Sequence, residues 1–135
     1  GHSDKGMLPL TRLATRNSVR VSEFVSDKRL SEVLEATKVG GATLTGMLGT
    51  SAWYAPGAAV SALVHSIACN QKKLFPCSVL LSGEYGLDDI CIGVPVILGH
   101  NGVEKIVDVD LNQEEKDKLR ISAQGVIKTN KLLQN

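Results

Sequence analysis

Long apolar runs, aromatic side chains and blocks of like charge are all scarce in this sequence. No uninterrupted apolar segment approaches the ~18 residues that a membrane-spanning helix needs. Fifteen Lys and Arg are balanced by fourteen Asp and Glu, and no run of basic residues exceeds two. Two Phe, two Tyr and one Trp offer little surface on which bases could stack. These scarcities argue against a membrane protein and against nucleic acid as a partner.

Cysteine and nucleotide-binding motifs are similarly limited. The three cysteines, Cys69, Cys77 and Cys91, are odd in number and form no C-x-x-C pair. They are typical of buried free thiols in a reducing compartment, so we expect a cytoplasmic protein without a zinc site. Asp88-Asp89 has no third oxygen-rich position at coordination spacing, which favours a turn over a metal site. The string from Gly41 to Gly46 lacks the lysine of a phosphate-binding loop, and no G-x-G-x-x-G follows a strand.

The 135 residues are enough for one domain with one core, so we predict a single domain over 1–135. A turn is indicated at Asn17-Ser18. A helix, or two joined end to end, is predicted over 26–49, because apolar residues recur there every three or four positions and Ser26 or Asp27 can cap the start. Gly40-Gly41 lies within this apolar stripe and predicts an irregular stretch over 39–43, either a kink or a close helix contact.

A second helix is predicted over 55–70, with Pro56 in its first turn. It is apolar on nearly all sides and rich in small residues, which is typical of a buried helix. His65 interrupts it and is interpreted as a satisfied or half-exposed core histidine rather than a ligand. The preceding pair, Trp53-Tyr54, is interpreted as packing rather than as a recognition surface.

Three strands are predicted next, over 76–82, 90–98 and 103–109. The first two are apolar on both faces, as expected for strands that are covered on both sides. Asn101-Gly102 predicts a type I′ hairpin turn, because both residues accept positive φ. Pro95 has no N–H to donate, so the middle strand is expected to have an edge or a bulge there.

The chain ends in a long predicted helix that begins with a capping box. Asn112 can accept from the first turn, and Glu115 can reach back to the cap. One face of this helix is expected to lie on the sheet; its apolar residues are Leu119, Ala123, Val126, Ile127 and Leu133. Because the strands cluster rather than alternate with helices, the fold class is α+β, an antiparallel meander packed by helices.

The first ten residues, G-H-S-D-K-G-M-L-P-L, carry His2 in a segment that fits neither a helix nor a strand period. A loop imidazole suits proton transfer because its pKa lies near neutrality. The residues alone leave the alternative open that His2 is a bystander at a surface terminus.

Four segments resemble the NAD-dependent lactate/malate dehydrogenase family. G-H-S-D-K-G-M-L-P-L is similar to the G-H-G-D-x-M-V-P-L stretch that carries the family's catalytic histidine. G-T-S-A-W-Y-A-P-G-A-A-V resembles the G-S-A-x-Y-A-P-A-A-x stretch of the lactate-dehydrogenase-like malate dehydrogenases. P-C-S-V-L-L-S-G-E-Y-G and I-G-V-P-V-I-L-G-H-N-G-V-E-K-I look like the sheet of the family's C-terminal domain. Two features depart from the pattern: Ser3 replaces a glycine, and the spacing from His2 to Met7 is one residue longer.

The resemblance implies that this chain is the substrate domain, and that the dinucleotide-binding domain which precedes it in the family is missing. His2 would exchange the hydroxyl proton of malate while a hydride passes to NAD, and Ser51 would line the substrate pocket. The resemblance implies no cofactor-binding or metal-binding residue within this chain. The expected substrate is a small 2-hydroxy or 2-keto dicarboxylic acid, and a homo-oligomer, dimer or tetramer, is expected.

Three interpretations remain open. The chain is the catalytic domain of a malate dehydrogenase, inactive alone; or it comes from a lactate or other 2-hydroxy-acid dehydrogenase; or it is an excised, non-catalytic oligomerisation domain. The apolar helix over 55–70 and the apolar strands would expose much surface without a covering half, which favours self-association.

Overall fold

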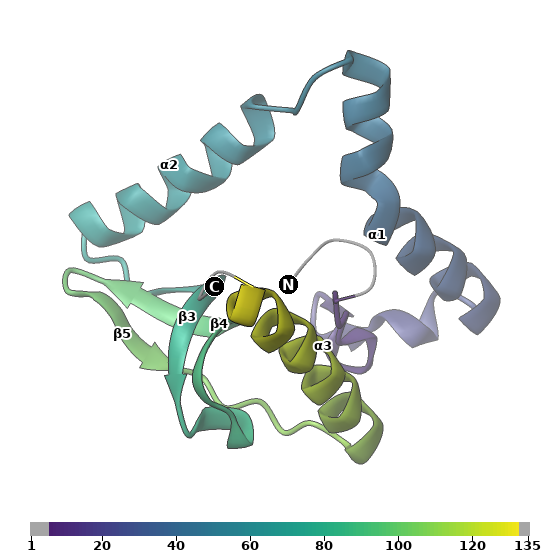
Figure 1. Cartoon of the computed structure of the whole chain (residues 1–135). Coiled ribbons are helices and arrows are strands. Elements are labelled where there is room, and N and C mark those ends of the chain that lie inside the picture. The colour runs from purple at the N-terminus through teal and green to yellow at the C-terminus, as the bar shows by residue number, and fades with distance from the viewer. Residues whose placement is uncertain (1–5, 133–135) are drawn as a thin grey trace. The chain divides into compact units, whose positions relative to one another are not determined.

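A computed structural model describes residues 6–132 and divides them into two compact units, residues 6–51 and residues 52–132. The first unit holds η1 (Thr11–Leu13), β1 (Thr15–Arg16), β2 (Val19–Arg20), η2 (Val21–Glu23) and α1 (Asp27–Leu48). The second holds α2 (Tyr54–Ala68), β3 (Lys73–Ser82), η3 (Glu84–Gly86), β4 (Asp88–Gly99), β5 (Gly102–Ile106) and α3 (Gln113–Leu132) (Figure 1).

In the first unit, β1 and β2 form a short antiparallel hairpin. Its turn residues, Asn17 and Ser18, have φ values of 50° and 67°, which confirms the predicted turn. The following helix, α1, begins at its predicted cap, where Ser26 Oγ accepts from the backbone N–H of Arg29 at 3.4 Å. Local side-chain chemistry thus sets both features.

The segment is one α-helix of 22 residues, α1, and its axis bends midway along its length (Figure 1), in keeping with the kink predicted around Gly40-Gly41. A Cβ added at Gly40 or Gly41 would meet no other atom within 4 Å among residues 6–132, so the alternative prediction, a close helix contact, is not met there. The hydroxyl of Thr43 donates to the carbonyl of Val39 at 3.1 Å, across the two glycines. The helical bonds of the long segment outweigh the cost of about 1 kcal/mol per glycine.

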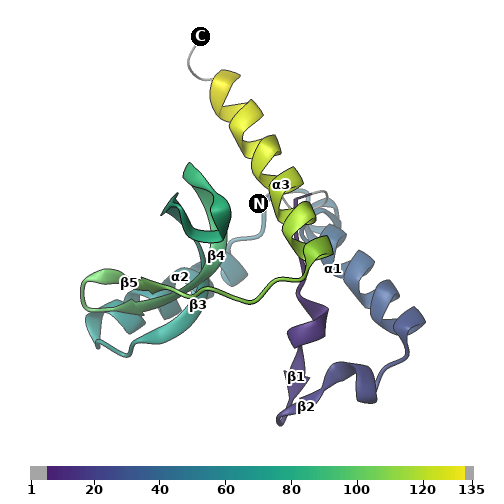
Figure 2. The same cartoon turned by 90° about the horizontal axis from the view of Figure 1, so that it is seen from below.

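In the second unit, β3, β4 and β5 form an antiparallel sheet in sequence order, which confirms the predicted meander and the α+β class. Figure 2 shows α3 running along one side of this sheet. Both α2 and α3 contact β4. The buried apolar residues of the unit come from one face of β4 and from the elements around it: Leu81, Ile90, Ile92, Val94, Val96, Leu98, Leu111, Leu119 and Ala123.

Within the described residues, the expectation that β3 and β4 are covered on both faces is wrong. Alternate residues of β4 are buried, whereas Cys91 and Gly93 between them are exposed. On β3, Leu74 and Leu80 are 62% and 57% exposed. Apolar residues on both faces of a strand favour two covered faces, but only one face of these strands is buried against other described residues.

The expectation that the second helix is buried all round is also wrong for the described residues. Val60 and Val64 are 57% and 58% exposed, and His65 is exposed rather than in the core. Only Ser66 of α2 is fully buried, and its hydroxyl donates to the carbonyl of Leu98 at 2.9 Å. The helix therefore meets the sheet through its C-terminal end.

Pro95 behaves as its chemistry predicts. The pairing of β4 with β5 ends at Val96 and Ile106, next to the proline, and the Pro95 carbonyl still accepts from Val107 at 2.8 Å. The ladder thus stops where the missing N–H would have been needed.

The hairpin between β4 and β5 lies where it was predicted, but its turn is not type I′. Of Asn101 and Gly102, only Gly102 has a positive φ, 83°. The backbone N–H of His100 donates to Asn70 Oδ1 at 3.0 Å, so a partner from outside the hairpin holds the turn. A glycine with positive φ beside a register shift is typical of a bulged hairpin.

The capping box of α3 is confirmed at both of its bonds. The N–H of Glu115 donates to Asn112 Oδ1 at 2.9 Å, and the N–H of Asn112 donates to Glu115 Oε2 at 2.9 Å. Leu119 and Ala123 are buried as expected, whereas Ile127 is 41% exposed and Leu133 lies outside the described residues.

Candidate functional site

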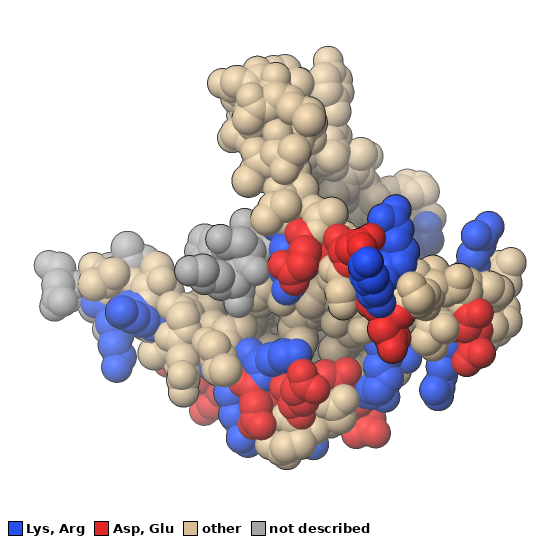
Figure 3. Space-filling model, turned by 90° about the vertical axis from the view of Figure 1, so that its right-hand side faces the viewer, with Lys and Arg blue, Asp and Glu red and all other residues tan. Residues whose placement is uncertain are grey.

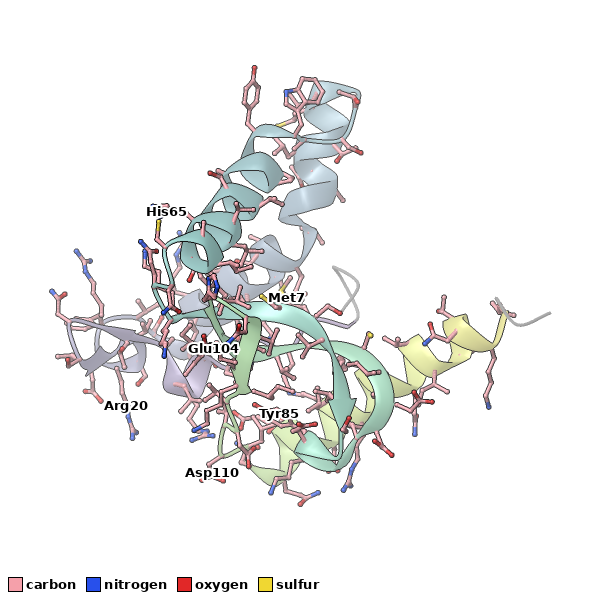
Figure 4. The ribbon with its side chains drawn as sticks, turned by 90° about the vertical axis from the view of Figure 1, so that its left-hand side faces the viewer. Met7, Arg20, His65, Tyr85, Glu104 and Asp110 are labelled. Carbon is pink, nitrogen blue, oxygen red and sulfur yellow. The ribbon has the colours of Figure 1, made fainter. Side chains whose placement is uncertain are left out.

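His2, the predicted catalytic residue, lies outside the described residues. The description of its segment starts at Gly6, and Met7 is 40% exposed while Leu8, Pro9 and Leu10 are half-buried (Figure 4).

Ser51, the predicted substrate-binding residue, is the last residue of the first unit. The helix α1 ends at Leu48, and Gly49 caps it in the left-handed region at φ 68° and ψ 4°. Thr50 and Ser51 follow in an exposed loop before α2 begins at Tyr54. The hydroxyl of Ser51 is therefore carried on a short loop and is open to contact with another molecule.

The aromatic pair next to this loop is exposed, so the prediction that it serves packing rather than recognition is not met among the described residues. Trp53 is 60% exposed and Tyr54 is 85% exposed. Their ring centroids lie 5.9 Å apart with the planes tilted by 45°. Among the described residues, the two rings thus contact each other.

The surface around these elements is also poor in charge. Between Lys38 and Lys72, no Asp, Glu, Lys or Arg occurs in the sequence. The upper part of Figure 3, where α1 ends, shows neither blue nor red. Exposed apolar side chains of this stretch include Val39, Leu44, Met47, Leu48, Val60 and Val64. Surfaces of this kind are typical of protein contacts.

A second polar feature, which sequence reasoning missed, is a clamp built by Tyr85. Its hydroxyl donates to the carbonyl of Val107 at 2.5 Å and accepts from the N–H of Val109 at 3.1 Å. Burial raises the pKa of the Tyr85 hydroxyl, and the nearby Asp108 charge raises it further against the lowering effect of the Val109 bond. The only sequence signal is the position of this tyrosine between Gly83 and Gly86.

The clamp borders a cavity of about 500 Å³ between the η3 turn and the start of α3. Tyr85 and Asp110 both line it and lie at the same end of this unit (Figure 4). Its charged side chains are of both signs: Glu84, Asp108, Asp110, Lys116 and Arg120. The N–H of Ser82 donates to Glu84 Oε2 at 2.6 Å, which lowers the pKa of that carboxyl group.

A third cluster joins the end of α2 to the hairpin of β4 and β5. Lys72 Nζ lies 3.6 Å from a carboxylate oxygen of Glu104. The Glu104 carboxyl lies against Gly99, so that a Cβ on residue 99 would be 2.5 Å from its Cδ. A side chain at position 99 would therefore require the end of the flexible Glu104 side chain to move. The ion pair links the segment after α2 to β5 of the hairpin, and we assign it a structural role.

Within residues 6–132, no group of three or more His, Cys, Asp or Glu side chains could hold a metal ion. None of the helices of this part of the chain is both long and apolar enough to cross a membrane.

Comparisons with known proteins match this arrangement. A family model described as lactate/malate dehydrogenase, alpha/beta C-terminal domain, matches residues 1–133. The chain belongs to this family. It is 61% identical over 133 residues to a malate dehydrogenase of Bacteroides thetaiotaomicron, with 98% of the chain aligned to 42% of that protein. The chain thus spans less than half the length of this relative.

Solved structures agree at the level of the fold. Malate dehydrogenase from Salinibacter ruber superposes with a TM-score of 0.94 at 43% identity, covering 97% of this chain and 43% of that one. Lactate dehydrogenase from Eimeria maxima with NADH and oxamate gives a TM-score of 0.93 at 34% identity, covering 98% and 43%. The lactate/malate dehydrogenase resemblance noted in the sequence is therefore confirmed.

Proposed function

We propose that this chain is the substrate-binding, catalytic part of an NAD-dependent malate dehydrogenase, which interconverts malate and oxaloacetate. The observation that carries the proposal is the 61% identity to a malate dehydrogenase across 98% of the chain. Identity at this level, in a family that acts on 2-hydroxy acids, supports a small dicarboxylic acid as the substrate. The exposed loop that holds Ser51 supports a contact with such a ligand.

In this proposal His2 handles the proton. A ring nitrogen of its imidazole takes the proton of the malate hydroxyl during oxidation and returns it to the oxaloacetate carbonyl oxygen during reduction. An imidazole suits both directions because both of its protonation states are accessible near pH 7. Ser51 would line the pocket and bind the substrate through its hydroxyl, a donor and an acceptor.

The described residues do not fit NAD by themselves. Dinucleotide-binding folds use parallel strands joined by helical crossovers, whereas β3, β4 and β5 are antiparallel. We therefore assign the cofactor, which accepts the hydride, to a dinucleotide-binding domain outside this chain. The isolated chain is expected to be inactive for that reason.

A second candidate activity is a lactate or other 2-hydroxy-acid dehydrogenase. The structural similarity to the Eimeria maxima lactate dehydrogenase favours it, although at 34% identity rather than 61%. Both activities would use His2 in the same way and would differ in the side chain of the substrate.

A third candidate is a non-catalytic role in oligomer contact, which the exposed, charge-free stretch over 39–71 favours. A homo-oligomer, either a dimer or a tetramer, is also compatible with catalysis, so this surface supports self-association under each interpretation. Cys69 and Cys91 are exposed and Cys77 is half-buried, so the prediction of buried thiols is wrong for the described residues. The odd number of cysteines and the lack of a C-x-x-C pair are typical of a reducing compartment, and we assign the protein to the cytoplasm.

The function is tested by replacing His2 with Asn in the complete dehydrogenase that carries this chain. Loss of the proton-transfer group should lower kcat for oxaloacetate reduction by about 100- to 10,000-fold. The matched control is His100→Asn, which changes an exposed histidine at the hairpin tip. Normal turnover by the His2 variant, or equal losses in both variants, would exclude the proposed role. Faster reduction of pyruvate than of oxaloacetate by the unmodified enzyme would favour the lactate alternative.

A further inference from the structure

We propose that Gly49 is a positioning residue for Ser51, because its left-handed backbone sets where the substrate-binding hydroxyl lies. The inference rests on the proposed function of Ser51. Gly49 follows the last residue of α1 and has a φ of 68° and a ψ of 4°.

The glycines of α1 and its cap differ in what they require. Gly40, Gly41 and Gly46 lie within the helix and are not among the residues with positive φ. Gly49 is in the left-handed region, which L residues other than Asn rarely adopt. Gly49 is thus the one glycine of this set whose conformation a side chain would oppose.

A side chain at position 49 would be unfavourable because of the backbone angles and not because of steric crowding. A Cβ at Gly49 would meet no other atom within 4 Å. An alanine would fit in the space but would favour right-handed helical angles, so α1 would continue past Leu48. The chain after residue 49 would then leave in another direction.

Ser51 follows Gly49 by two residues, so a change of direction moves its hydroxyl directly. A misplacement of about 1 Å in an active site can cost about 100-fold in rate. Asn at position 49 would tolerate the left-handed angles and leave Ser51 in place. The two variants therefore separate backbone conformation from the loss of glycine itself.

The experiment is a kinetic cycle in the complete dehydrogenase that carries this chain, with Gly49→Ala, Ser51→Ala and the double variant. We expect Gly49→Ala to lower kcat/KM for oxaloacetate about 10- to 100-fold. The same change in a Ser51→Ala background should have little further effect, because the hydroxyl that it displaces is already absent. Gly49→Asn should restore most of the activity.

Two controls make the outcome decisive. Gly46→Ala replaces an exposed glycine in the same helix that has helical angles and open space, and it should leave kcat/KM unchanged. Trp53 is the only tryptophan of this chain, so any tryptophan elsewhere in the enzyme is first replaced by phenylalanine. The fluorescence of Trp53 should then respond to acrylamide differently in Gly49→Ala and equally in Gly46→Ala and the parent enzyme.

The possible failures are distinguishable. Additive effects of Gly49→Ala and Ser51→Ala, or equal losses with Ala and Asn at position 49, would overturn the positioning role and leave the function of Ser51 intact. An unchanged KM and kcat in Ser51→Ala would instead remove the proposed function of Ser51, and the inference with it.

Discussion

At the scale of single residues, Tyr85 offers a pH-dependent test of the fold. Its hydroxyl bridges Val107 and Val109, and its pKa is raised above the ordinary value of 10.0 chiefly by burial. A raised pKa means that the folded state holds the proton more tightly than the unfolded state. The stability that the hydroxyl contributes is therefore complete below pH 10 and is lost as the pH rises through the raised pKa.

Replacing Tyr85 with Phe should lower the free energy of unfolding at pH 7 by about 1–2 kcal/mol, because one hydrogen bond is lost and the Val109 N–H loses its partner. The difference between the two proteins should shrink above pH 10, where the tyrosine loses its proton. Urea unfolding at pH 7, 9 and 11 measures this difference. Tyr54→Phe, an exposed control, should have no effect at any of these pH values. A constant difference between pH 7 and pH 11 would contradict the assigned pKa direction.

At the scale of elements, the cap of α3 is tested by changing Asn112. Asn112→Ala removes the acceptor for the N–H of Glu115, and the loss of such a cap costs about 1 kcal/mol. Asn112→Asp keeps an oxygen acceptor and adds a negative charge at the helix N-terminus, so it should retain or raise stability. Urea midpoints of the two variants measure the effect. Equal destabilisation by Ala and Asp would show that the cap bond does not stabilise this helix.

The elements also show which kinds of structure the sequence can predict. The caps at Ser26 and Asn112 and the turn at Asn17-Ser18 were predicted, because neighbouring atoms determine them. The turn at Asn101-Gly102 was predicted in position but not in type, since Asn70, thirty residues away, holds it. Rules based on neighbouring residues cannot predict a partner that is so distant in the sequence.

Burial was predicted less well than secondary structure for the same reason. An apolar pattern shows that a face can be covered, but it does not say by what. The exposed faces of α2 and β3 contradict the burial expected from their apolar residues, as Val60 and Leu74 illustrate. At the site, the residue types alone leave open that His2 is a bystander, and the role proposed for it rests on the resemblance of four segments to the family. His2 itself lies outside the described residues.

At the scale of the whole molecule, the exposed apolar stretch predicts self-association of the isolated chain. Val60 and Val64 are more than half exposed on α2, within a stretch that has no charged residue between Lys38 and Lys72. Burying such side chains against a second copy removes apolar surface from water, at about 25 cal/mol per Å². We therefore expect a dimer or a larger species in sedimentation velocity experiments at micromolar concentration.

Single substitutions locate the contact. Val60→Glu or Val64→Glu should shift the chain toward monomer, because an unpaired carboxylate is costly to bury in an apolar interface. Ile121→Glu is the matched control, since Ile121 is an equally branched residue, 65% exposed, on α3. It should sediment as the unmodified chain does. Circular dichroism of all three variants checks that they remain folded. An unmodified chain that stays monomeric at every concentration would count against self-association. An equal shift toward monomer in all three variants would show that the contact is not confined to α2.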